Sequence, residues 1–125
     1  MTAGEATVKK DGVIIMLAKS NDGIGGDHFY HQLADEPDIY KTMELFRKRK
    51  RSETVPDQWQ TQVLLRVLMH ATVIYVSEMD DEIIKKMHML PAKSIGEAIE
   101  IAKGILNNEN PKITAIPDGV SVIVK

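Results

Sequence analysis

The sequence contains no cysteine, which excludes disulfide-stapled scaffolds, cysteine-ligated zinc, iron–sulfur clusters and cysteine nucleophiles. Such a chain fits a reducing compartment. Long hydrophobic runs are also missing, and the longest ones, such as residues 13–18, are far too short to cross a bilayer. The first eight residues include Gly4 and Glu5 and lack the apolar centre of a signal peptide. We therefore expect a soluble, cytoplasmic protein with no membrane partner.

Neither sign of charge is in large excess, because 16 Lys and Arg oppose 18 Asp and Glu for a net charge of −2. One basic run, residues 47–51, could bind nucleic acid or another anion. No aromatic residue interrupts this run, although a single-strand binder would use such residues for stacking. Cations at the C-terminal end of a helix explain the run without a ligand. We expect no nucleic-acid partner.

The chain has the length of one domain, at 125 residues. Its hydrophobic content of 43% and charged content of 27% are globular values, so disorder throughout is excluded. The sequence shows no internal repeat, no low-complexity stretch and no linker. Residues 1–125 are therefore predicted to form a single domain with a core of its own.

Four segments are typical of strands. Residues 13–18 and 72–76 are continuous, apolar and rich in β-branched side chains, as strands buried on both faces of a parallel sheet are. Residues 112–116 and 120–124 flank the turn signal Pro117-Asp118-Gly119, which predicts an antiparallel hairpin. Helical patterns separate the first three segments. We therefore predict an α/β fold with a mostly parallel sheet of about four strands.

Helices are expected between these strands, and several have a recognisable start. Glu36-Pro37-Asp38 opens one helix, with Pro37 in its first turn, and Pro56-Asp57 opens another that ends near His70. Ser94 and Glu97 form a capping box for a helix that ends at about Leu106. Further helices are predicted over residues 27–33 and 80–87, and residues 3–10, before the first strand, are compatible with a helix.

A glycine-rich loop, which includes Asp22, Gly23, Gly25 and Gly26, follows the first strand and precedes a helix. Open α/β sheets bind ligands at this place, and glycines let backbone amides approach an anion. The spacing is not that of a Walker loop or of a dinucleotide fingerprint. The alternative is a tight connection that needs positive φ angles. The residues alone favour the tight connection.

The motif Pro56-Asp57-Gln58-Trp59 places the only tryptophan in the first turn of a helix. Its indole could form the wall of a pocket and donate one hydrogen bond. Alternatively, Trp59 anchors the core while Asp57 serves the helix terminus. As a pattern alone, the motif favours the core anchor.

Histidine offers one further possibility. His28 and His31 share a helix face and, with Asp27, could bind a metal ion. Two histidines without a cysteine or a His-Glu-x-x-His motif do not complete a site, so we expect no metal in this chain. His70 and His88 are expected at helix ends, where a cationic ring is favourable.

Taken together, the motifs resemble the C-terminal domain of nickel-dependent lactate racemases. The resemblance rests on Gly12-Val13-Ile14-Ile15, the loop from Asn21 to Gly26, Pro56-Asp57-Gln58-Trp59 and Ile116-Pro117-Asp118-Gly119, in that order. The opening Met1-Thr2-Ala3-Gly4-Glu5-Ala6 is similar as well. The likeness covers essentially the whole chain.

This resemblance implies a two-domain enzyme with its active site between the domains. The N-terminal domain, absent from this chain, would carry a nickel-pincer nucleotide on a lysine and two histidines that act as acid and base. In such enzymes the hydride on the α-carbon of a 2-hydroxy acid is removed and returned to either face. The chain would then be a fragment of an isomerase, inactive alone, with no cofactor of its own and with the N-terminal domain as its partner.

The resemblance also bears on individual residues. Trp59 matches a tryptophan that faces the substrate and cofactor, while Asp57 and Gln58 are predicted to line the cleft. The loop residues Asp22, Gly23, Gly25 and Gly26 are also predicted to line the cleft, and no catalytic residue is expected in this chain. The alternative function is a standalone α/β module that binds an anion or another ligand at this loop.

Overall fold

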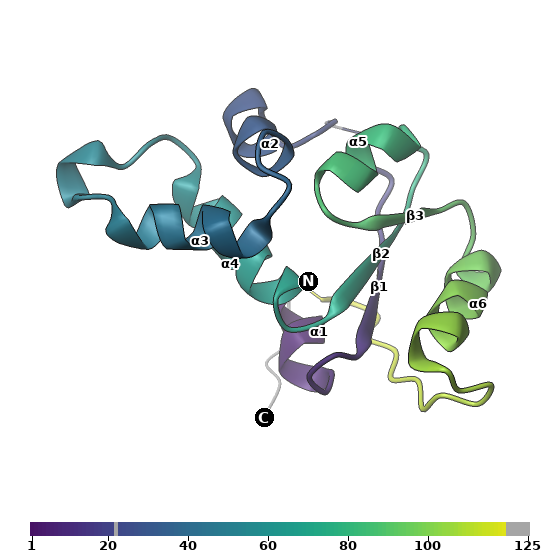
Figure 1. Cartoon of the computed structure of the whole chain (residues 1–125). Helices are drawn as coiled ribbons and strands as arrows, with labels where there is room; N and C mark the ends of the chain where they lie inside the picture. Colours follow the sequence, from purple (N-terminus) through teal and green to yellow (C-terminus); the bar gives the residue numbers. More distant parts are fainter. Residues whose placement is uncertain (22, 120–125) are drawn as a thin grey trace.

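Three parallel strands form the sheet at the centre of the domain, in the order β1-β2-β3 (Figure 1). The computed structural model describes residues 1–21 and 23–119. Its elements, in chain order, are α1 (Thr2–Thr7), β1 (Val13–Leu17), α2 (Asp27–Ala34), α3 (Ile39–Lys48), the 3-10 helix η1 (Arg51–Glu53), α4 (Gln58–Leu68), β2 (Thr72–Val76), α5 (Asp81–Lys86), β3 (Leu90–Ala92) and α6 (Ile95–Leu106). The described residues contain no helix that is long and apolar enough to cross a membrane.

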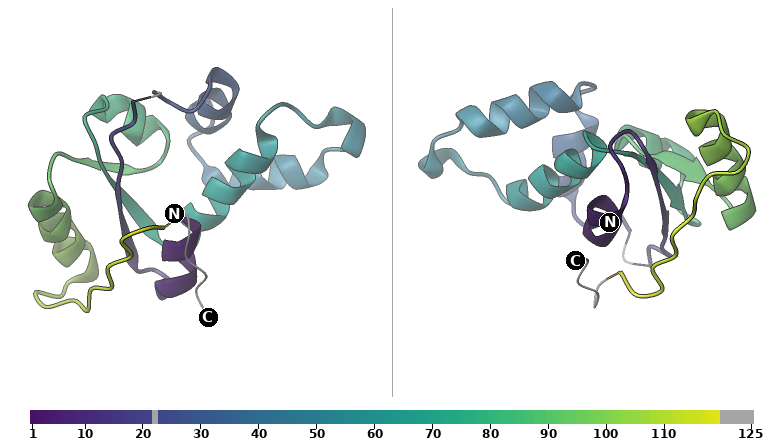
Figure 2. Two further views of the ribbon diagram at one scale, coloured as in Figure 1. Left: turned by 180° about the vertical axis from the view of Figure 1, so that it is seen from behind. Right: turned by 90° about the horizontal axis from the view of Figure 1, so that it is seen from below.

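Side chains alternate across the sheet and so build two cores, one on each face. On one face, Ile14 and Val73 pack into the larger core, which also takes buried residues from α2, α3, α4 and α5. On the other face, Ile74 packs against Ala98 and Ala102 of α6. The two small alanines, four residues apart, let α6 lie close to the sheet (Figure 2). The result is a sheet covered by helices on both faces, as predicted for an α/β fold.

Both connections between neighbouring strands contain helices, as parallel pairing requires. In the register of the first pair, Val13 lies opposite Thr72 and Leu17 opposite Val76, while Ile74 lies opposite Leu90 in the second pair. The predicted first and second strands are therefore confirmed, the second with its predicted bounds.

The predicted hairpin is wrong in the part that the structure describes. Residues 112–116 form no strand, and residues 120–124 lie outside the described residues. The third strand is instead β3, and all three strands run parallel. β3 was missed because Pro91 lowers its β-propensity, yet a strand at the edge of a sheet tolerates proline, which cannot donate a ladder hydrogen bond.

Polar side chains at three helix starts take up the first free amides. Asp38 accepts from the backbone N–H of Tyr40 at 2.9 Å and from that of Lys41, so α3 begins after Pro37 and not with Pro37 in its first turn as predicted. Asp80 caps α5 in the same way. Ser94 accepts from the Glu97 amide at 3.1 Å, which confirms the predicted cap of α6.

Two histidines connect helices that are distant in sequence. His88 Nε2 donates to the Leu33 carbonyl oxygen at 2.8 Å and so joins the end of α5 to α2. His70 Nε2 donates to the Val8 carbonyl oxygen at 3.1 Å and joins the end of α4 to α1. Both rings are half-buried. They lie near helix ends as predicted, and they stabilise the contacts between helices.

An arm projects from the sheet and carries the predicted tryptophan. The arm consists of α3, η1 and the first turn of α4, and Figure 1 shows it extending away from the strands. The other end of α4 belongs to the core, where Leu65 and Val67 have no exposed surface. The arm is therefore an extension of a helix that is fixed in the core.

The fully buried Leu65 gives a test of this packing. Replacing Leu65 by Ala should lower the free energy of unfolding by about 2–5 kcal/mol, because the change leaves a cavity in the core. Leu45 on α3 is 52% exposed, so Leu45→Ala should cost less than about 0.5 kcal/mol. Urea denaturation of the two variants measures both values, and equal costs would contradict the packing described here.

Candidate functional site

Two predicted motifs, separated in sequence by more than thirty residues, meet in space. A Cβ atom placed on Gly26, at the start of α2, would lie 3.8 Å from the carboxylate oxygen Oδ2 of Asp57, at the start of α4. Gln32 Nε2 donates a hydrogen bond of 2.7 Å to the Pro56 carbonyl oxygen and so joins the same two helices. We call the group formed by Gly26, Asp57, Gln58 and Trp59 the Trp59 corner.

Trp59 lies on the surface of the Trp59 corner. Its side chain is 67% exposed, although it belongs to the first turn of a helix whose later residues are buried. The interpretation of Trp59 as a core anchor is therefore wrong. An exposed indole offers a flat apolar surface and one N–H donor, which are the properties of a wall that faces a ligand or another domain.

Gln58 supports Trp59 from inside. Only 6% of Gln58 is exposed, and its Oε1 accepts a hydrogen bond of 2.9 Å from Nη1 of Arg49. The Arg49 guanidinium also lies over the ring of Phe46, with its Cζ atom 4.9 Å from the ring centroid. Arg49 therefore joins the end of α3 to the start of α4. This role of Arg49 was not predicted, because Arg49 lies within a basic run that was explained by the helix end.

Asp57 adopts a backbone conformation that is unusual for its residue type. Its φ is 59°, in the left-handed region, and its carboxylate makes no capping hydrogen bond with α4. Asp57 does serve the helix terminus, as the N-cap residue of α4, but it does so through its backbone. Its carbonyl oxygen instead accepts from the Thr61 amide at 3.1 Å. The carboxylate is left close to Gly26, in the Trp59 corner.

The glycine loop is a tight connection, as the residues alone favoured. Gly23, Gly25 and Gly26 have φ angles of 74°, 79° and 118°, in the region that side chains disfavour. Asp22, the other residue predicted in this loop, lies outside the described residues. The carboxylate of Asp57 stands near the N-terminus of α2, where an anion would have to bind. Its negative charge opposes the binding of a second anion at that helix end.

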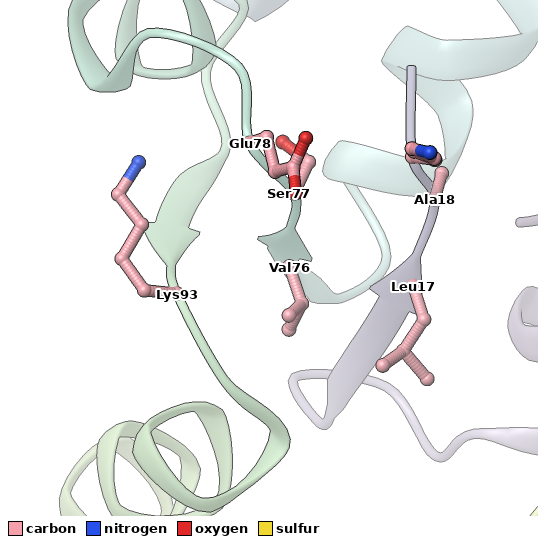
Figure 3. A pocket seen from close by; sticks show the side chains of 7 residues that line it. Leu17, Ala18, Val76, Ser77, Glu78 and Lys93 are labelled. Carbon is pink, nitrogen blue, oxygen red and sulfur yellow. The ribbon is translucent and has the colours of Figure 1, made fainter. Parts of the chain in front are cut away.

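An open groove lies where the parallel strands end, which is where α/β sheets bind ligands. Leu17, Val76, Ser77 and Glu78 line it at the ends of β1 and β2, opposite Lys93 (Figure 3). Its volume is about 590 Å³. Lys93 is already engaged, since its ammonium lies 2.6 Å from Asp81. Sequence reasoning did not single out these residues, although the position of strand ends was the available signal.

The two histidines of α2 do not form a metal site with other described residues. His28 and His31 are both exposed, and His31 Nδ1 lies 3.3 Å from Oδ1 of Asp35. Within residues 1–21 and 23–119, no group of three or more His, Cys, Asp or Glu residues is placed to hold a metal ion. The Trp59 corner, by contrast, brings together Gly26, Asp57, Gln58 and Trp59 of the predicted residues.

The support that Arg49 gives to Gln58 can be tested by mutation. Arg49→Ala should lower the free energy of unfolding by about 1–3 kcal/mol, because it leaves the buried Oε1 of Gln58 without a donor. The fluorescence anisotropy of Trp59 should fall in the same variant. Arg51 is exposed on η1, so Arg51→Ala is the matched control and should change neither quantity. Equal effects of the two changes would contradict the role of Arg49.

Comparisons with known proteins all find lactate racemases, and the matches cover all or nearly all of the chain. The profile of the lactate racemase C-terminal domain matches residues 1–124. The chain is 48% identical over 126 residues to the lactate racemase of Thermoanaerobacterium thermosaccharolyticum, covering 100% of this chain and 29% of that protein. It is 46% identical to the lactate racemase of Lactiplantibacillus plantarum, covering 100% of this chain and 30% of that protein.

A solved lactate racemase structure is similar to this chain in fold as well as in sequence. The lactate racemase apoprotein from Thermoanaerobacterium thermosaccharolyticum matches with a TM-score of 0.94 and 48% identity, over 100% of this chain and 30% of that chain. The chain thus spans less than a third of the length of these relatives. The family match covers nearly every residue and includes both motifs of the Trp59 corner, so this chain belongs to the lactate racemase C-terminal domain family.

Proposed function

We propose that this chain closes the active-site cleft of a racemase that acts on lactate or a closely related 2-hydroxy acid, with Trp59 facing the substrate. The observation that carries the proposal is the exposure of Trp59, at 67%, on a helix whose other end is fixed in the core. Family membership supports the same reading, because the relatives are lactate racemases. The reacting groups would belong to the rest of the enzyme, which is the partner of this domain.

The chemistry of the indole fits such a substrate. Racemisation requires the α-carbon to lose and regain a substituent, and water must be kept away from the reacting carbon meanwhile. A large apolar wall packs against the short carbon chain of a 2-hydroxy acid and excludes water from that side. The indole N–H adds one donor for an oxygen of the substrate. Trp59 is therefore proposed to orient and shield the substrate, with no proton of its own to transfer.

The other residues of the Trp59 corner help to hold Trp59 in place. Gln58 is held on its inner side by Arg49, and turning outward would break this hydrogen bond and remove a buried side chain from its site. Asp57 precedes Gln58 and Trp59 in the chain, and its carboxylate lies next to Gly26 at the start of α2. We propose that Asp57, Gly25 and Gly26 line the cleft, while Gln58 acts from the interior.

A nickel-pincer nucleotide is the cofactor that the family resemblance implies, and hydride acceptance is the chemistry it would supply. The Trp59 corner does not fit this cofactor, because it contains neither a lysine that could carry the nucleotide nor a histidine that could bind nickel. We therefore propose that the rest of the enzyme binds the cofactor. We assign no step of the cofactor's chemistry to residues of this chain. A chain without cysteine fits a reducing compartment, and we place the enzyme in the cytoplasm.

A standalone anion-binding module is the competing function. It would use the amides at the N-terminus of α2, next to Gly26. The nearby carboxylate of Asp57 opposes this, and the family match covers the whole chain. The observations therefore favour the enzyme domain.

Changing Trp59 in the full-length enzyme tests the proposal. Trp59→Ala should lower kcat/KM for lactate racemisation about 10- to 100-fold, which corresponds to about 1.4–2.8 kcal/mol of lost transition-state stabilisation. Trp59→Phe should retain part of the activity, because it keeps an apolar wall but loses the N–H donor. Conversion of one lactate enantiomer into the other, followed by chiral chromatography, measures the rate.

Tyr40 provides the matched control for Trp59. It is also an exposed aromatic residue, at 61%, but it lies on α3 outside the Trp59 corner. Tyr40→Ala should leave the rate unchanged. Wild-type activity in Trp59→Ala, or an equal loss in Tyr40→Ala, would refute the role proposed for Trp59.

The chain by itself should not racemise lactate. The described residues offer a wall and a support but no group that we assign to the removal of a proton or hydride. Purified chain incubated with one lactate enantiomer should therefore leave it unchanged under conditions in which the full-length enzyme equilibrates the two forms. Turnover by the chain alone would show that it contains catalytic groups. It would contradict the assignment of these groups to the rest of the enzyme.

A further inference from the structure

The segment after α6 has the composition of a strand but does not pair as one. Helix α6 ends at Leu106, and Asn107 follows in the left-handed conformation with φ 48°. From there to residue 119, the chain forms neither helix nor strand. Residues 112–116, which read Lys-Ile-Thr-Ala-Ile, are the part rich in β-branched side chains that was predicted to be a strand. We call these five residues the tail segment.

The tail segment exposes apolar side chains and backbone together. Ile113 is 62% exposed, Thr114 and Ala115 are exposed as well, and Ile116 is half-buried. No ladder joins the tail segment to any described strand. Extended chain with β-branched residues and no sheet partner pairs readily with the edge of another sheet, because its amides and carbonyls can complete a ladder there.

The sheet of this domain does not receive the tail segment. β1 is an edge strand whose one neighbour among the described strands is β2. The views in Figure 2 show the chain after α6 passing on the outer side of β1, without forming a strand there. Within the described residues the tail segment is therefore not part of the sheet and stays available to another partner.

The rest of the full-length enzyme is the available partner. This chain matches the solved relative from end to end, whereas most of that polypeptide lies outside the matched part. The fold of this chain therefore occurs in a protein that contains a much larger second part. Contact with the remainder of this longer chain would cover Ile113 and give the backbone of the tail segment a partner.

We propose that the tail segment joins a sheet of the N-terminal part of the full-length enzyme as an added strand. Side chains alternate along a strand, so Ile113 and Ala115 would face one side of the extended sheet while Thr114 and Ile116 face the other. Backbone pairing would supply the attachment, and Ile113 would be buried on docking. This inference rests on the proposed function only in that the chain works as one domain of a longer enzyme.

A photo-cross-linker in the full-length enzyme identifies the partner directly. Ile113 is replaced by p-benzoylphenylalanine, and the adducts formed on irradiation are mapped by mass spectrometry. We expect adducts with peptides that precede this chain in the full-length sequence. The same substitution at Ile105, 42% exposed in the last turn of α6, is the control and should give several-fold fewer of these adducts. Adducts with residues 13–17, or none above the control, would overturn the proposal.

Hydrogen exchange in the unmodified full-length enzyme provides a second measurement that needs no substitution. Amides of the tail segment should exchange about 100-fold more slowly than those of an unstructured peptide, because ladder hydrogen bonds must open first. Exchange at the unprotected rate would overturn the proposal. Neither measurement depends on turnover, so loss of the proposed activity and loss of the docking are distinguishable results.

Discussion

Burial of the second half of α4 is the interaction on which the position of the candidate site depends. Leu64, Leu65 and Val67 are at most 4% exposed and pack into the core against the sheet. An α-helix behaves as a stiff rod over two or three turns. Anchoring its C-terminal half therefore determines where its first turn projects. This explains how Trp59 can be largely exposed and still keep a defined place.

The first turn of α4 would nevertheless fray without further contacts, because its amides have no helical partners. The hydrogen bond from Arg49 to Gln58 and that from Gln32 to the Pro56 carbonyl hold it from two sides. Asp57, between them, has a left-handed conformation that costs on the order of 1 kcal/mol or more in a residue with a side chain. Such strain persists where neighbouring contacts determine the backbone, and it is found most often at functional sites.

The sequence predicted those features that depend on local pattern. The two buried strands β1 and β2 and the capped helix α6 were found because apolar periodicity and capping residues are local signals. β3 was missed because a short edge strand with Pro91 carries almost no pattern. The meeting of Gly26 with Asp57 could not be predicted, because it depends on how α2 and α4 cross the same face of the sheet. Local propensity also predicted a strand wrongly at residues 112–116. A strand there needs a pairing partner, which the described residues do not provide.

The two surfaces assigned to the rest of the enzyme differ in the kind of contact that they can make. Strand pairing by the tail segment would involve several backbone hydrogen bonds in a fixed register, and these are costly to break once formed. Contact through the indole of Trp59 is apolar and has at most one donor, so it can form and part without leaving polar groups unpaired. The first suits a permanent attachment, and the second suits a wall that must admit substrate and release product. Under these two proposals, the domain would remain attached to the rest of the enzyme through the tail segment while the cleft beside Trp59 opens.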